Sequence, residues 1–193
     1  GIFRNIYKFH CDLKGGYAVT HGADMKCVVI ISSFAVAVGN PVFVECFIDV
    51  GIAEQNLITM ASALAKSGCK PIAITESSFY QRAYDQIEQE MCRNNCAATL
   101  LVAFSGIYAH DDDTHIGFFE IGLLGNIPNL IYLAPSNKQT YLAMLEWSIE
   151  QNEHPVAIRI PWNGVRYTDE QVPKQYAKTR YKINKKGSDV EPF

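Results

Sequence analysis

The glutamate at position 54 is the first candidate for chemistry, because it follows an apolar stretch and precedes a helical pattern. Apolar residues recur downstream at the 3.6-residue spacing of a helix, and the pattern ends at Lys66 and Gly68. An acid in a first helical turn is ordinarily explained by the helix dipole, which stabilises it by up to about 1 kcal/mol. The alternative is a partly buried carboxyl whose pKa is raised by desolvation, so that it can share a proton with a ligand nitrogen.

Phe79 and Arg82 form a second candidate pair, one helical turn apart. The segment Ser78–Gln81 has the S-x-x-Q form of a capping box, which predicts a helix from there toward Asn94. In the structural interpretation Phe79 lies in the core and Arg82 pairs with a nearby acid on the surface. In the functional interpretation Phe79 is a stacking surface and Arg82 binds an anion at a helix N-terminus. The spacing leaves both open.

The segment Tyr108–Gly117 is the densest polar cluster in the chain, with three aspartates, Asp111–Asp113, between His110 and His115. It lacks the glycine and distal glutamate of a calcium loop, so a solvated acidic loop is favoured over a metal site. A histidine in a loop that follows a strand is also a candidate for proton transfer, because its ordinary pKa is about 6.5.

Short apolar runs alternate with longer helical patterns, which is typical of an α/β fold. Several runs are continuous, so we expect strands buried on both faces, as in a mostly parallel sheet flanked by helices in a three-layer sandwich. A further helix is expected after Ser136, which opens another S-x-x-Q pattern. The expected strands are Cys27–Ser32, Val42–Ile48, Pro71–Thr75, Thr99–Phe104, Leu130–Leu133 and Val156–Ile160.

The composition narrows the classes of partner. With 193 residues, 48% hydrophobic and 19% charged, the chain is typical of one globular domain, and its net charge of -3 does not favour nucleic acid or anionic lipid. No apolar run reaches the roughly 20 residues of a membrane span. The six cysteines are scattered, which favours a reduced, cytoplasmic protein. Cys92 and Cys96 lie one turn apart, but no second pair at zinc spacing follows, so we predict no metal site.

The domain organisation is expected to be simple. Residues 1–26 form a poorly defined N-terminal segment, 27–164 the α/β domain, and 165–193 a polar linker toward a missing C-terminal domain. Because the chain has no initiator methionine, we expect it to be part of a longer protein. Neither G-x-G-x-x-G nor G-x-x-x-x-G-K-[ST] occurs, so nothing in it predicts a loop that would hold a diphosphate.

Four motifs, "DVGIAEQN", "SSFYQRAYDQ", "TH-x-G" and "IPNL…AP", occur in this order. Together they resemble the pyrimidine-binding domain of thiamine-diphosphate enzymes of the transketolase family, and most of all its 1-deoxy-D-xylulose-5-phosphate synthase branch. The resemblance covers residues 47–161 and implies the pyrimidine-domain fold. It also implies that the cofactor is thiamine diphosphate, with Mg²⁺ bound by a diphosphate domain outside this chain.

The resemblance assigns roles to individual residues. Glu54 would hydrogen-bond the ring nitrogen of the aminopyrimidine and share a proton with it, which activates the cofactor, and Ile52 of the same motif would also contact the cofactor. Phe79 would stack on the aminopyrimidine, and Arg82 would bind the phosphate of the acceptor. Asp111 and His115 would line the substrate channel, with His115 transferring a proton or orienting the substrate carbonyl.

The family reaction decarboxylates pyruvate and adds the remaining two-carbon unit to an aldehyde, with glyceraldehyde 3-phosphate the implied acceptor. Because the cofactor lies between domains of partner subunits, the resemblance implies at least a dimer, expected to be a homodimer.

Several residues depart from the synthase pattern. Glu76 stands where the synthases have tyrosine, Phe104 and Trp162 where they have arginines, and Asn56 where they have histidine. The aspartates of the acidic loop replace the usual D-G-P. These departures weaken the case for a triose-phosphate acceptor and leave two alternatives open, a transketolase moving a ketol unit between sugar phosphates and a catalytically silent paralogous subunit.

Overall fold

The computed structural model describes residues 27–31, 47–107, 114–168 and 176. Six strands form one sheet in the order β2-β1-β3-β4-β6-β5, and every neighbouring pair is parallel. The predicted parallel sheet is therefore confirmed, although the part of the second predicted strand before Phe47 lies outside the described residues. The strands are β1 (Cys27–Ile31), β2 (Phe47–Asp49), β3 (Lys70–Glu76), β4 (Thr99–Ser105), β5 (Ile131–Leu133) and β6 (Val156–Pro161).

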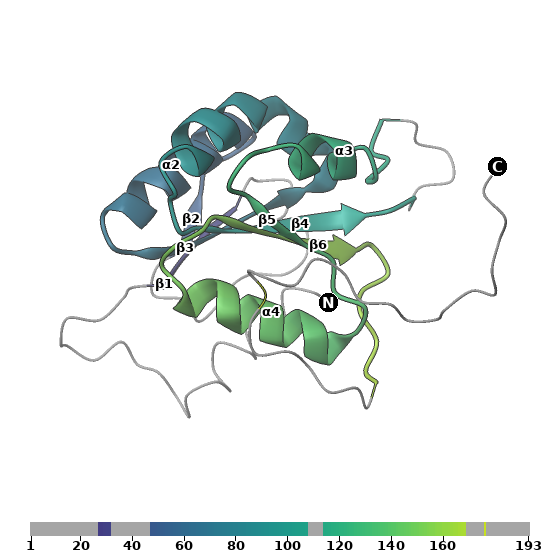
Figure 1. The fold of residues 1–193 in the computed structure, drawn as a ribbon. Helices are drawn as coiled ribbons and strands as arrows, with labels where there is room; N and C mark the ends of the chain where they lie inside the picture. Colours follow the sequence, from purple (N-terminus) through teal and green to yellow (C-terminus); the bar gives the residue numbers. More distant parts are fainter. Residues whose placement is uncertain (1–26, 32–46, 108–113, 169–175, 177–193) are drawn as a thin grey trace, which may run out of the picture.

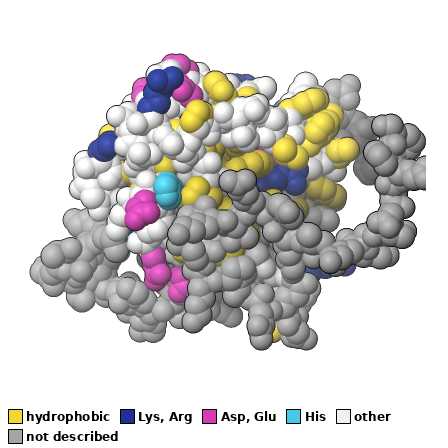
Figure 2. Space-filling view, viewed as in Figure 1, with side chains coloured by type: hydrophobic (Ala, Val, Ile, Leu, Met, Phe, Trp, Pro, Cys, Tyr) yellow, Lys and Arg dark blue, Asp and Glu magenta, His cyan; other side chains and the backbone are white. Residues whose placement is uncertain are grey.

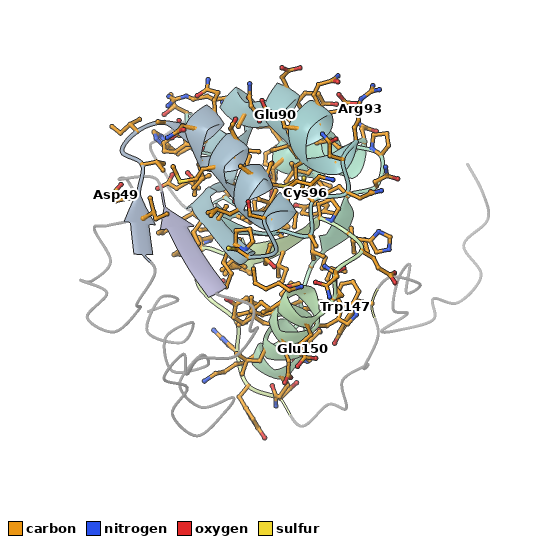
Figure 3. The ribbon with its side chains drawn as sticks, turned by 90° about the vertical axis from the view of Figure 1, so that its left-hand side faces the viewer. Asp49, Glu90, Arg93, Cys96, Trp147 and Glu150 are labelled. Carbon is orange, nitrogen blue, oxygen red and sulfur yellow. The ribbon has the colours of Figure 1, made fainter. Side chains whose placement is uncertain are left out.

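Helices cover both faces of the sheet, which confirms the three-layer sandwich (Figure 1). One face carries α2 (Glu54–Lys66), the 3-10 helix η2 (Ser77–Ala83), the π-helix η3 (Gln86–Cys92) and the short helix α3 (Glu120–Gly125). The other face carries α4 (Lys138–Glu150). In Figure 3, Trp147 and Glu150 of α4 lie below the sheet, and Arg93, which follows η3, lies above it.

Alternate residues of the central strands form two separate cores. Ala73, Leu100 and Ala157 pack under α2 and the neighbouring helices, whereas Ile74 and Leu101 pack against α4. Because both sides of each strand are buried, an alternating polar face would be costly, which explains the continuous apolar runs in the sequence.

Two predicted helix starts are wrong in detail. No capping box forms at Ser78, because β3 runs directly into η2, whose N-cap is Glu76 without a side-chain cap bond. The predicted single helix to Asn94 is instead a 3-10 turn followed by a π-helix. The second S-x-x-Q pattern is also not used, since Asn137 caps α4 by accepting a hydrogen bond from the Thr140 amide at 2.8 Å.

The carboxyl end of β4 is tied to the segment that follows the undescribed residues 108–113. Phe104 has φ 53°, and Gly106 and Gly117 form an antiparallel bridge in which the Gly117 amide donates to the Gly106 carbonyl at 2.9 Å. A Cβ on Gly117 would overlap Ser77 Oγ and the Phe104 carbonyl and would lie 2.9 Å from Ser105 Cα. Only glycine therefore fits where this segment crosses the start of η2.

Lys70 is a buried cation at the start of β3, only 4% exposed. Its ammonium donates to the Gln151 carbonyl at 2.6 Å, at the end of α4, and to Asn152 Oδ1. Burial lowers the pKa of Lys70. The contact ties the strand to the helix on the α4 face.

None of the helices in the described ranges combines the length and the hydrophobicity that a bilayer span requires.

We expect Gly117→Ala to lower the free energy of unfolding by about 1–3 kcal/mol, because the added methyl meets backbone atoms that cannot yield. The matched control is Gly122→Ala in α3, where a Cβ meets nothing within 4 Å. Since alanine is the better helix former, the control should leave stability unchanged or raise it by up to about 1 kcal/mol. Urea denaturation measures the free energy of unfolding of both variants. Equal effects would contradict the close approach of Gly117 to Ser77, Phe104 and Ser105.

Lys70→Met should lower the free energy of unfolding by about 1–3 kcal/mol, because it removes the charged donor of two part-buried hydrogen bonds. The pKa of Lys70 is lowered in the folded state, so the unfolded chain holds the proton to higher pH. The stability difference between wild type and Lys70→Met should therefore increase from neutral toward alkaline pH. Lys66→Met is the control, since Lys66 donates to the Asn94 carbonyl from an exposed position, and it should cost less.

Candidate functional site

Glu54 lies at the first position of α2 and is held by a tight turn after β2. Asp49 Oδ1 accepts a hydrogen bond from the Gly51 amide at 2.8 Å, and Gly51 has φ 73°, a conformation that favours glycine. The Glu54 residue is 2% exposed. Its Oε2 pairs with Arg82, and its Oε1 is buried with no hydrogen-bond partner among the described residues. The carboxyl is thus buried as predicted, with one oxygen available.

Phe79 and Arg82 lie on the same face of η2, because Tyr80 between them points into the core. The Tyr80 hydroxyl is fully buried within hydrogen-bond distance of the Ala73 and Leu101 carbonyls, at 3.3 and 3.1 Å. This anchor fixes η2 against the sheet, and Arg82 reaches Glu54 of α2 from it.

Arg82 contacts two of the other candidate residues. Its Nη1 lies 3.4 Å from Glu54 Oε2, and its guanidinium carbon lies 5.0 Å from the centre of the Phe79 ring. The side chain is 50% exposed, so this long ion pair is screened by solvent and contributes little stability. Because Glu54 is buried, its carboxylate would need another partner if Arg82 moved away.

His115 also contacts Phe79. The two rings meet edge to face, with centroids 5.3 Å apart and planes at 69°. Thr114 Oγ1 lies 2.6 Å from His115 Nδ1 and orients the imidazole. The structure therefore brings four predicted site residues into one continuous chain of contacts, from Glu54 through Arg82 and Phe79 to His115.

Of the other two predicted site residues, the structure describes one. Ile52 is 71% exposed in the turn before α2, so it presents an apolar surface without a partner within the described part of the chain. Asp111 lies outside the described residues.

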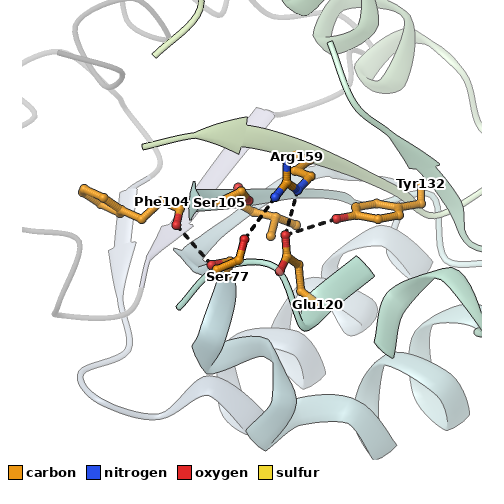
Figure 4. Close-up of polar contacts among 8 residues, drawn as sticks. Ser77, Phe104, Ser105, Glu120, Tyr132 and Arg159 are labelled. Atoms are coloured by element: carbon orange, nitrogen blue, oxygen red, sulfur yellow. Dashed lines mark hydrogen bonds and ion pairs between the residues drawn. The ribbon is translucent and has the colours of Figure 1, made fainter. Parts of the chain in front are cut away.

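A polar cluster that the sequence did not predict lies beside the site (Figure 4). Arg159 of β6 donates from Nε to Glu120 Oε1 at 2.8 Å, and the Tyr132 hydroxyl lies 3.5 Å from the same oxygen. Burial and the Glu120 carboxylate raise the pKa of Tyr132. One feature of the sequence could have indicated this cluster: the strand VAIRIP is otherwise apolar, so its arginine needs a buried partner.

A pocket of about 230 Å³ lies between η2 and α3. Ser78 Oγ and Glu120 Oε2 are buried there without a hydrogen-bond partner in the described ranges. The pocket lining comprises Ser77, Ser78, Gln81, Thr114, Ile116, Phe119, Glu120 and Leu123. It adjoins the site, because Ser78 and Thr114 are chain neighbours of Phe79 and His115.

Hydrophobic side chains are exposed around α3, as Figure 2 shows on the part of the surface above that helix. Phe118, Phe119 and Ile121 are 43%, 68% and 49% exposed, and the two phenylalanine rings stack at 4.4 Å. An exposed apolar group of this kind is typical of a surface that another part of a protein covers.

Metal ligands do not gather in the described part of the chain, where no group of three or more His, Cys, Asp or Glu side chains could hold an ion. Burial, reinforced by the neighbouring Cys96 and Glu88, raises the pKa of Cys92 to about 12. Because thiolates rather than thiols bind metal, this disfavours a site at Cys92 and Cys96. The acidic residues 111–113 lie outside the described residues.

Comparison with known proteins places this geometry in a family. The family model "Transketolase, pyrimidine binding domain" matches residues 15–166. The 1-deoxy-D-xylulose-5-phosphate synthase of Clostridium acetobutylicum is 37% identical over 149 residues, which are 77% of this chain and 24% of that protein. The synthase of Halothermothrix orenii is 42% identical over 119 residues, 62% of this chain and 19% of that protein. The matched part of the chain thus spans about a fifth to a quarter of the length of these relatives.

Solved structures share the fold. A split-gene transketolase, described as an inactive beta4 tetramer, superimposes with a TM-score of 0.65 at 24% identity, over 86% of this chain and 55% of that one. A transketolase mutant from Pichia stipitis also gives a TM-score of 0.65, at 14% identity, over 76% of this chain and 24% of that one. Since the family model covers most of the chain and the fold agrees, the chain belongs to the transketolase pyrimidine-binding-domain family.

Proposed function

We propose that this chain is the pyrimidine-binding portion of a thiamine-diphosphate-dependent 1-deoxy-D-xylulose-5-phosphate synthase. Such an enzyme joins the two-carbon unit of pyruvate to glyceraldehyde 3-phosphate and releases carbon dioxide. The relatives that bear this name, at 37% and 42% identity, support the proposal. Because the chain spans about a quarter of their length, the rest of the site would come from other domains or from a partner subunit.

The observation that carries the proposal is the buried oxygen of Glu54 without a partner among the described residues. Leaving such an oxygen unpaired costs about 1–3 kcal/mol, so a ligand with a matching nitrogen is expected beside it. Phe79, 9% exposed, is linked to Glu54 through Arg82, and the exposed Ile52 in the turn before α2 supplies apolar surface. An aminopyrimidine, a flat ring edged with nitrogens, fits these three residues.

Each residue then has a definite task. Glu54 binds the ring nitrogen and shares a proton with it, and Phe79 packs against the ring. When bound, thiamine diphosphate supplies a thiazolium carbon that can attack a carbonyl. Arg82, half exposed, can turn toward an anionic acceptor when another partner binds Glu54, and His115, oriented by Thr114, moves a proton at the substrate oxygen. Asp111 would line the same channel.

The cofactor's charged end lies beyond this chain in the proposal. A diphosphate-binding domain would hold the diphosphate and Mg²⁺, and the exposed apolar residues around α3 are consistent with a surface covered by another part of the assembly. The assembly would be at least a homodimer, located in the cytoplasm.

A transketolase is the second candidate, and it is favoured by Asn56, which is exposed on the first turn of α2. Phe104 stands where the synthase resemblance leads one to expect a phosphate-binding arginine and Trp162 where it leads one to expect another arginine, and Trp162 is 47% exposed near the end of β4. These departures concern the acceptor, whereas Glu54 and Phe79 serve the cofactor in both enzymes. They also leave open a paralogous subunit that has lost catalysis.

The donor substrate separates these candidates. We expect the full-length protein, with thiamine diphosphate and Mg²⁺, to release carbon dioxide from pyruvate when an aldehyde acceptor is present, measured with carboxyl-labelled pyruvate. A transketolase would release none and would consume a ketose phosphate instead. Neither activity, together with no cofactor heat by titration calorimetry, would identify a silent subunit.

Glu54→Gln should lower turnover roughly 10²–10⁴-fold, because the amide keeps the volume of the carboxyl but cannot exchange a proton. The control is Glu150→Gln at the exposed end of α4, on the opposite face of the sheet (Figure 3). Both variants should keep the wild-type circular dichroism. Wild-type turnover in Glu54→Gln would rule out the assigned role of this carboxyl.

A further inference from the structure

We infer that Arg159 is a positioning residue that sets the place of His115 by holding both ends of the segment from Gly117 to Glu120. The inference rests on the proposed function for the role of His115, but one of its tests does not depend on that role.

The guanidinium of Arg159 makes two separate contacts (Figure 4). Nε donates to Glu120 Oε1 at 2.8 Å, and Nη2 donates to the Gly117 carbonyl at 3.1 Å. Because the guanidinium is planar and rigid, the two bonds fix the distance and the angle between the two acceptors. A single cation on β6 therefore defines the path of the segment that enters α3.

This path determines where His115 lies, because His115 is two residues before Gly117. The Gly117 amide is tied to Gly106, and the Gly117 Cα faces Ser77 at the start of η2, where a Cβ would not fit. Since η2 also carries Phe79, the same contacts set the 5.3 Å spacing between the Phe79 and His115 rings. The two hydrogen bonds of Arg159 go to Glu120 and Gly117 rather than to either ring.

The burial of the pair argues that it has a purpose besides stability. The Glu120 side chain is 1% exposed and that of Arg159 is 21% exposed. Desolvation of two charges offsets most of their attraction, so a buried ion pair is a poor source of net stability, and apolar residues often replace one without loss. A pair that fixes geometry beside a reacting group has a reason to be retained.

Two substitutions of Arg159 distinguish a role in positioning His115 from a role in stabilising the fold alone. Arg159→Lys keeps a cation that can reach Glu120, but an ammonium on a flexible stem cannot hold both acceptors at a fixed angle. Arg159→Met removes the charge and both donors. If Arg159 only supports the fold, lysine should restore both stability and activity. If it positions His115, lysine should restore stability without restoring turnover.

In the full-length enzyme we expect Arg159→Lys to keep a melting temperature close to that of wild type. Its kcat should fall roughly 10- to 100-fold, because the catalytic group is misplaced, while KM for pyruvate should change less than about twofold. The limb of the pH–rate profile assigned to His115 should shift in the same variant. The matched control is Arg93→Met, which breaks an exposed pair of the same 2.8 Å Nε to Oε1 geometry with Glu88, away from the site. The control should keep wild-type kcat.

Labelling of His115 with diethyl pyrocarbonate, followed by mass spectrometry, provides the test that needs no catalysis. Modification should be several-fold faster in both Arg159 variants than in wild type and in Arg93→Met. Wild-type labelling and wild-type kcat in Arg159→Lys would overturn the inference. If the wild-type enzyme shows no turnover, the proposed function fails, and the labelling rates alone then decide whether Arg159 positions His115.

Discussion

A carboxyl group withdrawn from water needs partners for its oxygens, and this requirement governs the site. Glu54 is held at the start of α2 by the turn at Gly51, and among the described residues Arg82 pairs with one of its oxygens. The other oxygen has no partner in the described part of the chain, so that part leaves a hydrogen-bonding demand unmet. In the proposed function a ring nitrogen of the ligand meets that demand.

The parallel sheet is what gathers the remaining groups around this carboxyl. Parallel strands end at the same edge, so the segments that leave β2, β3 and β4 meet there. The first carries Glu54, the second carries Phe79 and Arg82, and the third leads across the Gly106–Gly117 bridge to His115. The domain can thus present an acid, an aromatic ring, a cation and an imidazole on one side while its two cores stay apolar.

Much of this could be read from sequence, and the failures have identifiable causes. The strands were predicted because runs buried on both faces stay apolar, and Glu54 because helical periodicity begins beside it. The S-x-x-Q patterns misled, since at Ser78 the strand continues directly into the helix and leaves no free cap position, while at Ser136 the neighbouring asparagine supplies a better cap. Helix α3 has six residues, too few for a periodic pattern to appear.

By itself, the sequence determined the layered α/β architecture, the parallel strands and the residue types available for chemistry, because burial and helical period leave their mark on local patterns. Tertiary structure alone decided which of those residues meet. The contacts of Arg82 with Glu54 and of Arg159 with Glu120 and Gly117 join residues 28, 39 and 42 positions apart. No local sequence pattern encodes contacts between residues so far apart in the chain. They follow from the order of the strands in the sheet and from the position of Gly117, where the lack of a side chain allows two backbone segments to pack closely.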